Sequence, residues 1–113
     1  MESTRQQKVA RMLQKELGAY FQQHAREILP GKMITVTVVR VSPDLAVAKV
    51  YLSIFPMDKE EDPLKKIQAH ASPIRNTIGH LIRNQVRSVP EFIYYLDDSL
   101  DYIENIDNLL KDE

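Results

Sequence analysis

The residues with the clearest chemical potential are basic and polar side chains that recur at helical spacing after residue 73. At about 100° per residue, one side of a helix over this stretch is apolar and the other is polar. The polar side carries Arg75, Asn76, Gly79, His80, Arg83 and Arg87. Arginine side chains bind phosphate oxygens, and a glycine within a helix leaves room for a close backbone such as a phosphate chain. The pattern indicates an anion-binding face, and the alternative is the solvated face of an ordinary amphipathic helix.

A break at Ser72-Pro73 should divide the helical region that carries this face. Proline removes a hydrogen bond from a helix interior, but it fits the first turn of a new helix, and serine is a good N-cap. We therefore expect a short helix over about residues 63–71, capped by Asp62, and a second helix that starts after Ser72 and runs to about Arg87. We expect the arginines to be solvent-exposed, because the apolar side holds Ile74, Ile78, Leu81, Ile82 and Val86.

A search for catalytic or metal-binding patterns finds none. The chain has no cysteine and only three glycines, so GxGxxG and Walker A loops are both absent. The three histidines, His24, His70 and His80, lack the spacing of metal ligands. Asp97, Asp98 and Asp101 form a carboxylate cluster that is more typical of a helix start than of acid–base catalysis. We predict no catalytic residue, no metal and no cofactor.

Length and charge bound the class of protein. The 113 residues predict a single domain over 1–113, with no membrane span, and the polar N-terminus favours a cytoplasmic protein. The formal net charge of −1 conceals an asymmetry. Residues 1–90 hold 14 Lys and Arg against 8 Asp and Glu, whereas residues 91–113 hold 1 against 8. A basic body with an acidic end can bind an anion through one face.

Hydrophobic periodicity predicts the remaining elements. A capping box at Ser3 or Thr4 should start a helix over about residues 4–28, with Val9, Leu13, Leu17, Tyr20 and Phe21 on its apolar side. Lys8, Arg11 and Lys15 lie on the opposite side, which is either a solvated face or part of a binding surface. Strands are expected over 34–41 and 46–55, joined by the turn residues Ser42-Pro43-Asp44, and over 92–96, followed by a helix over about 100–110. The order predicts a two-layer α+β fold with a mixed three-stranded sheet.

Several of these segments together resemble the bacterial ribosome-binding factor A family. They are the hairpin Val41–Tyr51, the kink Ala71-Ser-Pro with Ile74-Arg75 after it, and the segment Val89–Ser99. The resemblance spans nearly the whole chain and implies a type II KH-like fold. It also implies binding to the small ribosomal subunit and to its 16S rRNA or precursor late in assembly, which matters most in the cold. An assembly GTPase is a further candidate partner, and we expect a monomer.

With the resemblance, the basic face is interpreted as an RNA-binding surface. Its residues would be Ser72, Arg75, Asn76, Gly79, His80, Arg83 and Arg87, extended by Lys8, Arg11 and Lys15. Pro73 stands where the family usually has glycine, and the chain has no GxxG loop. The alternative function is a protein–protein interaction module that uses the basic helix and the acidic C-terminal end. An enzyme that uses Asp97 or Asp98 is a third, weaker hypothesis.

Overall fold

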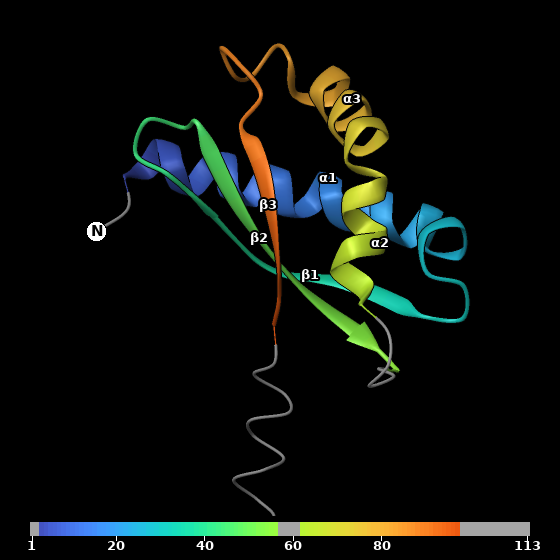
Figure 1. The fold of residues 1–113 in the computed structure, drawn as a ribbon. Helices are drawn as coiled ribbons and strands as arrows, with labels where there is room; N and C mark the ends of the chain where they lie inside the picture. The colour runs from blue at the N-terminus through green and yellow to red at the C-terminus, as the bar shows by residue number, and fades with distance from the viewer. Residues whose placement is uncertain (1–2, 57–61, 98–113) are drawn as a thin grey trace, which may run out of the picture.

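The structure is a computed structural model that describes residues 3–56 and 62–97 (Figure 1). These residues form α1 (Thr4–Ile28), β1 (Met33–Val41), β2 (Val47–Phe55), α2 (Pro63–Ala69), α3 (Ala71–Ile82) and β3 (Glu91–Leu96). The predicted order of elements is confirmed through β3. The predicted helix near residues 100–110 lies outside the described residues, as do Asp98 and Asp101 of the carboxylate cluster.

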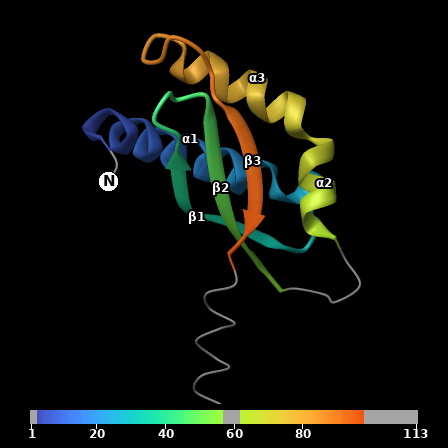
Figure 2. The same ribbon diagram turned by 60° about the vertical axis from the view of Figure 1, so that its left-hand side comes forward.

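The strands form one mixed sheet in the order β1-β2-β3. β1 and β2 are antiparallel, and β2 and β3 are parallel, with Val47 opposite Glu91 and Leu52 opposite Leu96. A parallel pair requires a crossover connection, which α2 and α3 provide. α1 crosses behind the sheet, and α2 and α3 lie on the side of β3, so no described helix covers the face of the sheet seen in Figures 1 and 2. The predicted two-layer α+β architecture is confirmed.

The hydrophobic core lies between the sheet and the helices. The predicted apolar side of α1 is buried, and α3 contributes Ile74, Ile78 and Ile82, each with no exposed surface. One predicted core residue is wrong, because Leu81 is 53% exposed. The buried isoleucines are four residues apart, so their stripe rotates by about 40° at each step around the helix. Leu81 lies on the opposite side of Ile74 from the direction of this rotation, so it is left outside the core.

Polar side chains of α1 cap the helix and bind it to β1. Ser3 and Gln6 form the predicted capping box, and Gln6 also donates a buried 2.9 Å hydrogen bond to the carbonyl oxygen of Val41. Gln14, two turns further on, donates to the carbonyl oxygen of Thr37. These side chains attach α1 to β1, which is an edge strand of the sheet. A β-bulge between Val36 and Val38 changes which residues face the core, a feature that the alternating sequence did not predict.

The break between the two helices is confirmed, but its position is corrected. α2 ends at Ala69, His70 separates the helices, and α3 begins at Ala71, so Ser72 is not the N-cap. Pro73 occupies the third position of α3, where its missing N–H would have had no partner within the helix. The first helical bond comes one residue later, from the N–H of Ile74 to the carbonyl of His70. A proline therefore fits any position of the first turn that precedes this bond, because no N–H is needed there.

The end of α3 is also corrected, because the helix stops at Ile82 and not near Arg87. Residues 83–85 form a turn, and the N–H of Val86 still bonds to the carbonyl of Ile82 at 3.2 Å. Val86 is therefore buried as predicted, although it lies beyond the helix. The helical spacing persists for one turn past the helix end, which explains why periodicity overestimated its length.

Candidate nucleic-acid interface

The basic face predicted on α3 borders an open depression of about 340 Å³ between this helix and the segment that leads to β3. The residues that line it are Arg75, Asn76, Gly79, His80, Arg83 and Val89. Five of these six were predicted site residues, and they come together because positions 75, 76, 79, 80 and 83 share one side of a single helix. The structure thus places these five predicted residues around one concave surface.

Arg75 has a role that the sequence did not reveal. Its guanidinium donates a 2.6 Å hydrogen bond to the carbonyl oxygen of Pro90 and a 2.7 Å bond to that of Val89. Arg75 lies only about 20° from Ile82 around the helix axis, so its side chain flanks the buried stripe and reaches the segment before β3. It is exposed, as predicted, but its donors are partly used to hold the segment that begins β3.

The structure also gives a reason for a glycine at position 79, and it differs from the predicted approach of a phosphate backbone. A Cβ placed on Gly79 would lie 3.2 Å from Cγ2 of Val89. The absent side chain therefore lets the segment before β3 pack closely on α3, which explains this glycine without a phosphate backbone. Together with Arg75, Gly79 fixes one wall of the depression.

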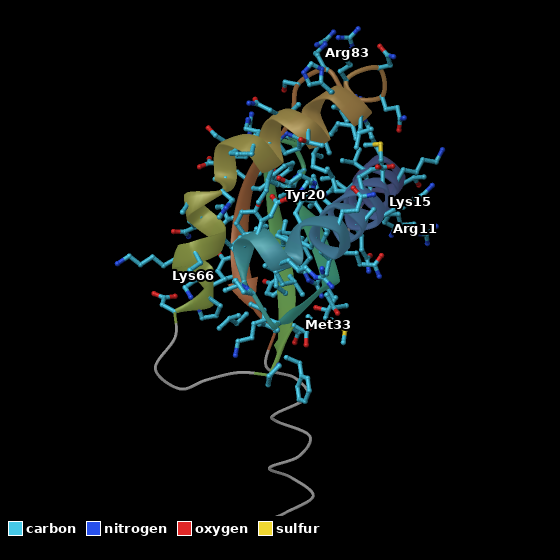
Figure 3. The ribbon with its side chains drawn as sticks, turned by 90° about the vertical axis from the view of Figure 1, so that its right-hand side faces the viewer. Arg11, Lys15, Tyr20, Met33, Lys66 and Arg83 are labelled. Carbon is cyan, nitrogen blue, oxygen red and sulfur yellow. The ribbon has the colours of Figure 1, made fainter. Side chains whose placement is uncertain are left out.

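The other side chains at the depression are available to a ligand. Asn76, His80 and Arg83 are exposed, and within residues 3–56 and 62–97 they make no side-chain hydrogen bond or ion pair. Arg83 is the residue after α3 and points away from the molecule in Figure 3. Its guanidinium can present two parallel N–H donors to a phosphate, which a lysine cannot do.

The remaining predicted residues do not line this depression. Ser72 is exposed in the first turn of α3, and Arg87 is exposed in the segment between α3 and β3. Lys8, Arg11 and Lys15 are exposed on α1, and Figure 3 shows Arg11 and Lys15 pointing in a different direction from Arg83. Lys15 borders a separate depression of about 300 Å³ between α1 and β1.

Three of the groups considered for catalysis or metal binding have structural partners. Asp97 accepts a hydrogen bond from the hydroxyl of Thr37, and His24 contacts Glu27 and stacks on Tyr20. His70 Nδ1 lies 3.1 Å from the carbonyl oxygen of Lys66. Over the described ranges, no group of three or more His, Asp or Glu could hold a metal ion. No helix in the same ranges is long and apolar enough to cross a bilayer.

The order and pairing of the helices and strands define the structural class of the protein. A mixed three-stranded sheet in an α-β-β-α-α-β chain, with an interrupted helix pair before the last strand, is an α+β protein of the KH-like class. The crystal structure of ribosome-binding factor A from Thermus thermophilus has the same fold. Its TM-score is 0.66 at 22% identity, over 80% of this chain and 94% of that one. A Thermus thermophilus ribosome-binding factor A model fitted into a cryo-EM map of a 30S complex gives 0.64 at 20% identity, over 79% and 91%.

Sequence comparison identifies the family. The family model described as Ribosome-binding factor A matches residues 5–110. Ribosome-binding factor A of Cytophaga hutchinsonii is 47% identical over 110 residues, which cover 97% of this chain and 83% of that protein. The Flavobacterium johnsoniae protein of the same name is 41% identical over 111 residues, with 97% and 85% covered. This chain belongs to the ribosome-binding factor A family, which is described by what it binds and not by a reaction.

Proposed function

We propose that this chain is a non-catalytic assembly factor of the cytoplasm that binds the small ribosomal subunit and its 16S rRNA or precursor. Family membership supports the partner, since a Thermus thermophilus relative has been fitted into a 30S complex. The observation that carries the site is the depression on α3, where Asn76, His80 and Arg83 have no protein partner among the described residues. Residues 1–113 would act as a single RNA-binding domain.

The mechanism would be electrostatic and based on shape. Arg83 and Arg87 would neutralise phosphates, and binding would release the counterions condensed on the RNA. Asn76 and His80 would orient the backbone by hydrogen bonds within the depression. Ser72 lies in the first turn of α3, whose N-cap His70 supplies no side-chain bond, so the N–H groups there remain open to a phosphate. Lys8, Arg11 and Lys15 on α1 would contact RNA only where it extends to another side of the protein.

Co-sedimentation with small subunits through sucrose gradients, at several salt concentrations, tests this proposal. The Arg83→Gln, Arg87→Gln double variant should bind more weakly and should lower the slope of log affinity against log salt by about 1.4 to 1.8. Arg26→Gln is the matched control, because Arg26 is an exposed arginine of α1 far along the sequence from the depression. Arg26→Gln should reduce binding less than Arg83→Gln alone or Arg87→Gln alone.

Two results would contradict the proposal. If the double variant folds and binds with the affinity and slope of the wild-type chain, this side of α3 is not the RNA surface. If binding survives both RNase and high salt, the chain recognises a protein, which is the function of an interaction module.

A further inference from the structure

The face of the sheet opposite the helices carries an arrangement that neither the core nor the α3 depression uses. No described helix covers this face, which Figures 1 and 2 show toward the viewer. Two neighbouring rows of side chains run across the three strands there. One row consists of Arg40, Lys49 and Ile93, and the next consists of Val38, Tyr51 and Tyr95.

The first row places two like charges directly opposite each other. Arg40 pairs with Lys49 across β1 and β2, both side chains are exposed, and neither has an ion pair within the described residues. Like charges in this position destabilise a sheet, so the pair adds nothing to folding. An anion bound between the Arg40 and Lys49 side chains would be attracted by both and would offset their repulsion.

The second row presents an aromatic platform. The rings of Tyr51 and Tyr95 are stacked, with centroids 5.3 Å apart and planes at 23°. Tyr95 is 37% exposed and Val38 is 38% exposed, so the platform is open to solvent. Residues two apart in a strand are separated by about 7 Å, which places the cations within one nucleotide's reach of the rings.

The charges around these rows limit what can bind. Glu91 pairs with Val47 at one end of the face, and Asp97 follows Leu96 at the other end. The carboxylate of Asp97 already accepts a hydrogen bond from the hydroxyl of Thr37. The positive potential is therefore confined to the middle of the sheet, beside the tyrosines, and a ligand must combine a planar apolar group with a nearby anion.

We propose that this open face is a second RNA-binding surface, which takes single-stranded RNA with a base stacked on the Tyr51–Tyr95 platform and a phosphate between Arg40 and Lys49. Stacking on aromatic side chains, with cations along the backbone, is how sheet surfaces bind unpaired nucleotides. The inference deepens the proposed function, because it rests on RNA being the partner of this chain. It adds a surface that faces away from the helices.

Fluorescence anisotropy of the full chain with a labelled 12-nucleotide oligoadenylate tests this surface. The Arg40→Gln, Lys49→Gln double variant should lower the salt slope by about 0.7, the value for one phosphate contact with a single strand. Tyr95→Leu should weaken binding by roughly fivefold or more, the loss expected for one stacked base. Tyr95→Phe keeps the ring and should remain within about twofold of the wild-type affinity. Arg26→Gln is again the control, because it removes an exposed positive charge from another part of the protein.

The outcomes separate this surface from the α3 depression. Wild-type affinity and slope in both the double variant and Tyr95→Leu would overturn the proposal, and so would a failure of the wild-type chain to bind the oligonucleotide. Equal losses in Tyr95→Phe and Tyr95→Leu would overturn stacking. If the variants lower the thermal midpoint and leave RNA binding unchanged, the face packs against protein, which also overturns it. Subunit binding by the Arg83 and Arg87 variants is measured independently, so either surface can fail alone.

Discussion

Replacing Arg75 should destabilise the protein, although this arginine is exposed and lies in a basic patch. In Arg75→Gln the carbonyl oxygens of Val89 and Pro90 lose the guanidinium that binds both of them. The bond to Pro90 is partly buried and the bond to Val89 is exposed. Charge-assisted bonds contribute about 1.5 kcal/mol or more, and water replaces an exposed one at little cost. We expect Arg75→Gln to lower the free energy of unfolding by about 2 kcal/mol.

Urea unfolding followed by circular dichroism measures this loss. At unchanged m-value, a decrease of about 2 kcal/mol should shift the midpoint by about 1 M, and the thermal midpoint should fall by roughly 8 °C. Arg75→Lys should lose about half as much, because an ammonium group reaches only one of the two carbonyls. Arg83→Gln is the control on the same face, and we expect it to stay within about 0.5 kcal/mol of the wild-type chain.

A result in which Arg75→Gln and Arg83→Gln unfold at the same midpoint would refute this reasoning. Water would then bind the two carbonyl oxygens as well as the guanidinium does, and Arg75 would be as free to bind a ligand as Arg83. If Arg75→Gln is less stable, a loss of subunit binding in that variant would not be evidence of a phosphate contact. The distortion of the depression, one wall of which Arg75 holds, would be sufficient to explain it.

Three further predictions concern single groups. Tyr94→Phe should raise stability by about 1 kcal/mol in thermal unfolding, because the buried hydroxyl has no protein partner among the described residues. Burial also raises the pKa of the Tyr94 hydroxyl, so the unfolded chain ionises first and the free energy of unfolding falls as the pH rises above about 10; Tyr94→Phe, which lacks this hydroxyl, should unfold less readily in alkali. Gly79→Ala should stabilise by about 1 kcal/mol in a Val89→Ala background but by less in the wild-type chain, as a double-mutant cycle in urea would show. The hydrogen bond from Ser42 lowers the pKa of Asp44, so NMR titration should find that carboxyl below the ordinary aspartate range, with its stabilisation lost as the pH falls through its folded-state pKa.

Patterns that depend on nearby residues predicted most of the fold. The capping box, the apolar stripe of α1 and the Asp62-Pro63 start of α2 are set within one helical turn, and each is confirmed. The parallel pairing of β2 with β3 follows from the helical crossover between them. Asp44 is confirmed as a turn residue, since its carboxylate accepts from the hydroxyl of Ser42 at 2.7 Å.

The errors arise where the outcome depends on distant partners. The sequence placed Arg75 with the other arginines because helical phase alone cannot show that a segment 14 residues later will lie beside it. The reason for Gly79 depends in the same way on Val89. The bulge in β1 reflects pairing with β2, and the end of α3 reflects the path to β3. The segment Val89–Ser99 supported the family resemblance, yet the contact of Val89 and Pro90 with α3 has no local signal.

The position of Arg75 changes how the basic side of α3 would contribute to the proposed RNA binding. A helix face that carries three nearby arginines suggests three phosphate contacts, but the guanidinium closest to the buried stripe already binds two carbonyl oxygens. Because Arg75 is bound to the segment just before β3, it cannot turn its donors outward without releasing that segment. The salt dependence of RNA binding, which reports counterion release, should therefore come from Arg83 and Arg87, which make no such bonds within the described residues. The basic side of α3 would thus combine two tasks: Arg75 and Gly79 build one wall of the depression, and Arg83 and Arg87 would supply the charge of the proposed RNA surface.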